Sequence, residues 1–178
     1  MQEVFGTPGG DWFAPRFAEI VPNVVRLVKA YGSRVVFTRY VAPAEPRGAW
    51  VPYFQDWPFA LQPPDSPLWD IVPALAEPAR AQQAAGIGPV TATTFTKWGT
   101  QLATLVGHGP MILTGVATDC CVVSTALPAA DAGMETWVVR EAVAAGTDEG
   151  QVRAIDLMDG YAPLIRVVGM EQALAAAA

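Results

Sequence analysis

The sequence has few charged residues, one histidine, two cysteines and no long uninterrupted apolar run. Charged residues make up 16% of its 178 residues and hydrophobic residues 52%, a balance typical of a chain that buries a core rather than a disordered one. No apolar run reaches the roughly 20 residues that a membrane-spanning helix needs. The first residues lack the basic and then apolar pattern of a signal peptide. We therefore expect one globular domain over residues 1–178.

Basic residues are scarce as well. The chain has 11 Lys and Arg against 17 Asp and Glu, for a formal net charge of -6, and the basic residues are scattered. Nucleic acids and anionic membranes attract proteins through clusters of Lys and Arg. The sequence therefore predicts neither a nucleic acid nor a membrane as a partner.

The two cysteines, Cys120 and Cys121, are neighbours in the sequence. A disulfide between adjacent residues is strained, so we expect two free thiols and a reducing, cytoplasmic location. The single histidine, His108, precedes an apolar strand and would lie at the opposite end of the sheet from the thiols. A Cys–His pair is therefore not expected. Metal ligands do not cluster in the sequence, so we expect no metal and no other cofactor.

Short apolar runs alternate with helical patterns along the chain. Strands are predicted over residues 34–40, 90–94, 110–116, 135–140 and 163–168. Helices are predicted over residues 17–30, 68–76, 100–106, 119–132 and 170–177, and another helix after its cap, Thr147. This alternation predicts an α/β fold with a mostly parallel sheet covered by helices on both faces.

Reactive side chains follow two of these strands, at the sheet edge where ligands of such folds bind. Cys121 would lie in the first turn of a helix, where free N–H groups and the helix dipole favour a thiolate and an oxyanion. An ammonium group at Lys97 would lower the pKa of a nearby thiol. Each residue also has a simpler interpretation: Cys121 as a buried apolar side chain and Lys97 as a surface lysine. Asp119, which could otherwise replace a catalytic base, is better interpreted as a helix cap.

A longer pattern surrounds these positions. Residues 114–126 read Thr-Gly-Val-Ala-Thr-Asp-Cys-Cys-Val-Val-Ser-Thr-Ala, followed by Asp-Ala-Gly at 131–133 and Val-Val-Arg-Glu-Ala-Val-Ala-Ala at 138–145. Met-Gln at the start and Thr-Lys-Trp at 96–98 agree with the same pattern. The chain resembles the isochorismatase-like cysteine hydrolases over nearly its whole length, least so over residues 42–89.

The resemblance implies a Rossmann-like three-layer α/β/α fold and an enzyme that hydrolyses non-peptide C–N bonds. The nucleophile maps onto Cys121 and its lysine partner onto Lys97. The oxyanion hole would use the N–H groups of Ala117 and Cys121, after a cis peptide bond between Val116 and Ala117. Phe5 and Trp98 flank the matched positions, so we expect them to bind the substrate.

Two departures from the family pattern qualify this assignment. The family's catalytic Asp ends a central strand just before the Met-Gln pair, and residues 1–178 do not include it. Three explanations stay open: a natural protein that starts upstream of Met1, a shortened form of the chain, and a degenerate member in which another segment fills the gap. We favour the first. Residues 38–40 read Thr-Arg-Tyr where the metal-dependent nicotinamidases have Asp-x-His, which argues against that activity.

The predicted function is hydrolysis of a small amide, ureido or carbamoyl compound through a thioester acyl-enzyme. The alternative is a catalytically degenerate binding or scaffold protein. For either function we expect a small-molecule ligand and a homo-oligomer.

Overall fold

The structure is a computed structural model that describes residues 1–107 and 109–177. His108, which was expected at the opposite end of the sheet from the thiols, lies outside the described residues. No helix among the described residues is long and apolar enough to cross a membrane.

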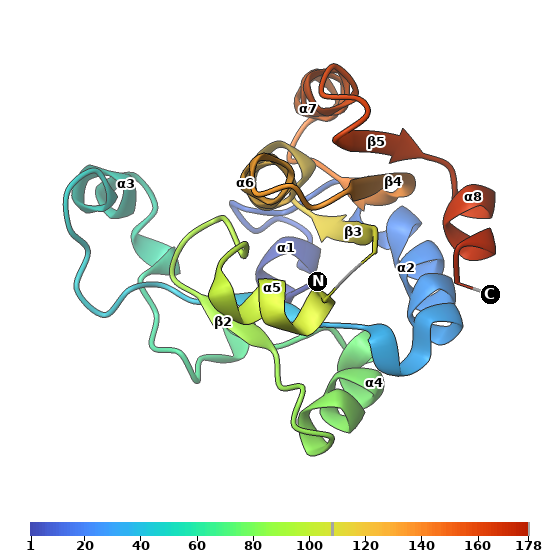
Figure 1. The fold of residues 1–178 in the computed structure, drawn as a ribbon. Coiled ribbons are helices and arrows are strands. Elements are labelled where there is room, and N and C mark those ends of the chain that lie inside the picture. Colours follow the sequence, from blue (N-terminus) through green and yellow to red (C-terminus); the bar gives the residue numbers. More distant parts are fainter. Residues whose placement is uncertain (108, 178) are drawn as a thin grey trace.

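All five strands of the described residues run in parallel pairs, in two separate sheets (Figure 1). One sheet has the order β3 (Met111–Val116), β4 (Thr136–Ala144), β5 (Ile165–Val168). The other pairs β1 (Thr38–Tyr40) with β2 (Val90–Ala92). β4 is buried along most of its length, as expected for a strand between two neighbours with helices on both faces.

Helices cover both faces of the three-stranded sheet. α6 (Val123–Asp131) and α7 (Asp148–Asp159) contact one face, and α2 (Phe17–Tyr31) and α8 (Met170–Ala175) contact the other (Figure 1). The α2 residues that are buried, Phe17, Ile20, Val24 and Leu27, recur every three or four positions and so form one helix face. The predicted α/β fold with three layers and a parallel sheet is confirmed.

The remaining helices are short or lie outside these layers. They are α1 (Glu3–Gly6), α3 (Trp50–Asp56), α4 (Pro73–Ala84) and α5 (Thr100–Val106). Single 3₁₀ turns occur at Gly32–Arg34, Pro58–Ala60 and Pro67–Trp69.

Several predicted elements start at other residues than expected. The strand predicted over 34–40 begins only at Thr38, because a 3₁₀ turn occupies Gly32–Arg34. The helix predicted over 68–76 is instead α4, with Pro73 in its first turn, where a missing N–H costs nothing. The helix predicted over 119–132 is divided into a π-helical turn, Thr118–Val122, and α6.

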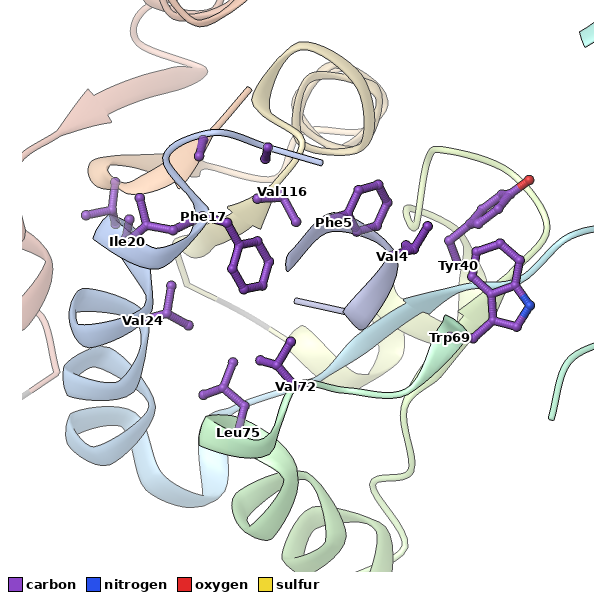
Figure 2. Close-up of a cluster of buried hydrophobic side chains, with 14 of the residues drawn as sticks. Val4, Phe5, Phe17, Ile20, Val24, Tyr40, Trp69, Val72, Leu75 and Val116 are labelled. Atoms are coloured by element: carbon purple, nitrogen blue, oxygen red, sulfur yellow. The ribbon is translucent and has the colours of Figure 1, made fainter. Parts of the chain in front are cut away.

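The largest cluster of buried apolar side chains joins the N-terminal residues to α2, β1 and the segment before α4. Figure 2 shows Val4, Phe17, Val24, Val72 and Leu75 converging in it. At its edge the ring of Tyr40 packs edge-on against Trp69, with ring centroids 5.3 Å apart. This packing holds the carboxyl end of β1 against the 3₁₀ turn Pro67–Trp69.

A cavity of about 320 Å³ separates the two sheets. Its lining includes Val36 and Thr38 from the side of β1, and Ile112 and Leu113 from β3. Among the described residues β1 pairs only with β2 and β3 only with β4, so the facing edges of β1 and β3 both border this cavity. The cavity extends to Lys97 and Cys121.

Candidate active site

Cys121 lies in the turn that follows β3. The peptide bond between Val116 and Ala117 is cis, the conformation that the resemblance implies for it. The carbonyl of Ala117 accepts hydrogen bonds from the N–H groups of Cys120, at 3.1 Å, and Val122, at 3.0 Å. These bonds tighten the start of the helix and bring the thiol of Cys121 to the carboxyl end of the sheet.

Lys97 is almost fully buried, with 7% of its surface exposed. Its ammonium group donates hydrogen bonds to the carbonyls of Thr94, at 3.0 Å, and Phe95, at 2.7 Å. It also lies 5.7 Å from the ring centroid of Tyr40. Burial lowers the pKa of Lys97, and the negative charge of Cys121 partly offsets this effect.

The thiol of Cys121 is acidic. A side-chain hydrogen bond from Cys120, the ammonium of Lys97 and the backbone N–H of Ala117 lower its pKa to about 6, against the opposite effect of burial. The hydrogen bond to Cys121 and burial raise the pKa of Cys120. These contacts therefore favour the thiolate form of Cys121 and the neutral thiol form of Cys120.

A pocket of about 450 Å³ opens beside Cys121, and half of its lining residues are aromatic. Trp12 lies at the centre of the aromatic cluster, stacked on Phe5 with ring centroids 6.1 Å apart and tilted against Tyr53 at 6.2 Å. Phe95 packs edge-on against Tyr53 at 5.7 Å. The walls therefore offer flat apolar surfaces within reach of the thiolate, a setting suited to a small ligand with a flat or apolar group.

The structure brings together most of the residues predicted for the site. Phe5, Ala117 and Cys121 line the aromatic pocket, and Lys97 and Cys121 line the cavity between the sheets. The backbone N–H of Ala117 is close enough to the sulfur of Cys121 to help lower the pKa of that thiol.

Trp98 does not line this pocket, contrary to the expectation that it binds the substrate. Its side chain packs against the cluster formed by Val90, Leu102 and Met111. Trp98 follows Lys97 directly, and successive side chains of the segment point in different directions. The tryptophan therefore enters the core beside α5 while Lys97 turns toward Cys121.

Asp119 was interpreted as a helix cap, and it does not cap its own helix. Its carboxylate accepts a long hydrogen bond, 3.4 Å, from the N–H of Gly146. It also lies so close to Gly150 that a side chain there would collide with it. Asp119 thus contacts the start of α7, where the helix dipole favours a negative charge.

Sequence reasoning missed several aromatic residues of the pocket, among them Tyr40 and Tyr53. Tyr40 is the last residue of β1, and the rule that ligands bind at the carboxyl ends of parallel strands could have singled it out. Tyr53 lies on α3, within residues 42–89, where the family resemblance is weakest. No group of three or more His, Cys, Asp or Glu side chains suited to a metal ion occurs within residues 1–107 and 109–177.

Comparisons with known proteins agree with this geometry. The isochorismatase domain family matches residues 1–170. No curated protein sequence matches the chain.

Solved structures with the same fold are distant in sequence. A cysteine hydrolase from Pseudomonas syringae pv. phaseolicola 1448A superposes with a TM-score of 0.82 at 17% identity, covering 100% of this chain and 90% of that one. An isochorismatase-like hydrolase from Alkaliphilus metalliredigens gives 0.74 at 16% identity, with 99% and 93% covered. A nicotinamidase from Bacillus subtilis gives 0.73 at 17% identity, with 94% of both chains covered.

At such identities the superpositions establish the fold alone. The family is established by the match over residues 1–170. The parallel α/β fold is consistent with that match. This chain belongs to the isochorismatase domain family of hydrolases.

Proposed function

We propose that the chain is a cysteine hydrolase that cleaves the C–N bond of a small amide, ureido or carbamoyl compound through a thioester at Cys121. The observation that carries the proposal is the buried ammonium of Lys97 beside an acidic thiol, at the mouth of an aromatic pocket. A thiolate is the nucleophilic form of cysteine. A pKa of about 6 makes it the main form of Cys121 at neutral pH.

The reaction would start with attack of the thiolate on the carbonyl carbon of the bound amide. The N–H groups of Ala117 and Cys121 would donate hydrogen bonds to the developing oxyanion. Collapse of this intermediate requires a proton on the leaving nitrogen. The Lys97 ammonium is a suitable donor, because burial lowers its pKa and makes it a stronger acid.

The second half of the reaction would release the acid. Water attacks the thioester, the neutral Lys97 amine takes up the proton of that water, and the thiolate of Cys121 is regenerated. The aromatic pocket would hold the acyl group during both steps. Free thiols at Cys120 and Cys121 suit a reducing compartment such as the cytoplasm.

The family resemblance assigns proton transfer to an Asp that residues 1–178 do not contain, a role that the steps above give to Lys97. Lys97 and Cys121 both line the cavity between β1 and β3, so a carboxylate held in that cavity would lie near both. A form of the protein extended upstream by the next in-frame strand, compared with residues 1–178, would measure what such a carboxylate adds to turnover.

The proposal is tested by trapping the acyl-enzyme. A library of small amides and ureido compounds is incubated with the protein, and intact mass is measured after rapid acid quenching. We expect an acyl adduct on Cys121 and release of ammonia or amine, with neither in Cys121→Ala. Cys120→Ser is the matched control and should still form the adduct. An adduct on Cys120, or turnover that survives in Cys121→Ala, would show that the assignment is wrong.

The outcome also decides between enzyme and binding protein. If compounds bind in the pocket and no adduct or turnover is detected with either the short or the extended form, the chain is a binding protein with this fold.

A further inference from the structure

The pocket beside Cys121 is lined by acidic residues and by no basic ones among the residues that the structure describes. Its charged lining residues, among those the structure describes, are Asp11 and Asp119, and no Lys or Arg lines it. Both carboxylates are exposed. Neither has a Lys, Arg or His nitrogen within 4.0 Å among the described residues.

The acids stand beside aromatic rings that remain accessible. Trp12, Tyr53, Trp57 and Phe95 are each half-buried and line the pocket. The rings meet at steep angles: Trp12 and Trp57 are 6.4 Å apart at 63°, and Tyr53 and Phe95 are 5.7 Å apart at 70°. Rings in this arrangement present faces to the pocket from more than one direction.

Aromatic faces carry a negative electrostatic potential and attract cations. Tyr40 also lines the pocket. Its hydroxyl has no hydrogen-bond partner among the described residues, and Tyr40 is only 1% exposed. The site near the sulfur adds a thiolate at Cys121, which the ammonium of Lys97 balances. Asp119 contacts the start of α7, where the helix dipole offsets its charge, so Asp11 is the carboxylate left without a balancing charge in the pocket.

Based on this pattern, we propose that the acyl group of the substrate carries a positive charge, such as an alkylammonium group or a cationic ring, which the aromatic wall and Asp11 hold. The inference rests on the proposed function in one respect, namely that the pocket binds the substrate. An anionic acyl group is disfavoured by the same features, because it would face two carboxylates and the ring faces.

Binding is measured with three amides of similar shape: 4-(trimethylammonio)benzamide, 4-tert-butylbenzamide and 4-carboxybenzamide. The first two differ in charge at nearly constant shape, so their affinity ratio isolates the cation. Titration calorimetry with the full chain carrying Cys121→Ala makes the measurement independent of turnover. We expect the cationic amide to bind roughly tenfold tighter than its neutral isostere, and the anionic amide to bind weakest.

Variants locate the effect. Asp11→Asn should reduce the preference for the cation about threefold and leave the affinity for the tert-butyl compound unchanged. Asp65→Asn, an exposed acid that does not line the pocket, is the matched control and should change neither value. Trp57→Leu keeps an apolar contact and removes a ring face, so it should lower the affinity for the cation alone. Circular dichroism confirms that each variant is folded.

Equal binding of the cationic and neutral amides by the parent chain would overturn the inference, as would tightest binding of the anion or binding of none of the three. These results do not depend on whether any variant folds. Turnover is followed separately with Cys121 present. Hydrolysis of the neutral amide without a preference for the cation would leave the proposed function intact and refute this inference. Preferred binding of the cationic amide without turnover of any amide would support this inference and refute the proposed function.

Discussion

The backbone N–H of Lys97 and the backbone carbonyl of Cys121 are joined through one hydroxyl group. The side chain of Thr125 accepts a hydrogen bond from Lys97 at 2.9 Å and donates one to Cys121 at 2.7 Å. Thr125 is 3% exposed, so water does not compete for these bonds. The loop that carries the ammonium and the helix that carries the thiol are thus fixed relative to each other.

Replacement of Thr125 by Val keeps the shape of the side chain and removes both bonds. Because the N–H and the carbonyl would then be buried without this partner, we expect Thr125→Val to lower the free energy of unfolding by about 1–3 kcal/mol. It should also weaken turnover, since the two reactive groups lose their common support. Thr125→Ser retains the hydroxyl and should lose less in both measurements. Urea unfolding gives the first quantity, and equal stability of the Val variant and the parent would contradict the prediction.

The neighbouring thiol, Cys120, has a testable effect on Cys121. Its hydrogen bond is the largest single contribution to the low pKa of Cys121, so Cys120→Ala should raise that pKa. Cys120→Ser keeps a donor and should leave the pKa near the parent value of about 6. The rate of alkylation of Cys121 by iodoacetamide against pH, followed by mass spectrometry of the peptide, reports the midpoint. A midpoint that is the same in all three proteins would show that Cys120 plays no such role.

Substitution of Lys97 is expected to reduce activity without reducing stability. Lys97→Met removes the positive charge, so the pKa of Cys121 should rise and hydrolysis should fall by about 100-fold or more. Stability should change little or increase, because burying the ammonium costs solvation free energy that a Met does not. The comparison requires turnover, the pH dependence of alkylation and urea unfolding on the same preparation. A large loss of stability together with an unchanged alkylation profile would assign Lys97 a structural role.

Gln2 is a buried residue whose side chain hydrogen-bonds to the backbone and should contribute to stability. It is 2% exposed; its amide nitrogen donates to the carbonyls of Tyr40 and Trp69, both at 2.8 Å, and its oxygen accepts from the N–H of Tyr40 at 2.9 Å. Gln2→Leu leaves three buried backbone groups without this partner, so we expect a loss of about 3 kcal/mol in the free energy of unfolding. Gln101→Leu, at an exposed position, is the control and should change it by less than about 0.5 kcal/mol.

Sequence reasoning predicted the parallel sheet and the positions of the thiol and the lysine, because both depend on local patterns. The alternation of apolar runs defined the strands, and the turn after Val116 defined the start of a helix. Of the aromatic residues that line the pocket, only Phe5 was predicted. Trp12, Tyr53 and Phe95 come from three separate segments, and no local pattern shows that these segments meet.

The misplaced start of β1 has a similar cause. Val35, Val36 and Phe37 are as apolar as a buried strand, yet they are only half-buried and precede β1. Val36 lines the cavity between the sheets, where β1 has no neighbouring strand on that side. Pairing with other strands, which the sequence of one segment does not contain, decides which residues of an apolar run become a strand. The expected homo-oligomer remains a prediction that gel filtration would test.

The acidic thiol should also make stability depend on pH. The pKa of Cys121 falls from its ordinary value of 9.0 to about 6 in the folded protein. Between these values the unfolded chain binds the proton and the folded chain does not, so the free energy of unfolding rises as pH increases from about 6 to 9 and this contribution is lost as pH falls through about 6. In Cys121→Ser the hydroxyl does not titrate in this range, so the rise should be smaller than in the parent. Urea unfolding of both proteins at several pH values measures the difference between the two slopes. Because all other groups are shared, parallel curves would mean that Cys121 is not ionised in the folded state.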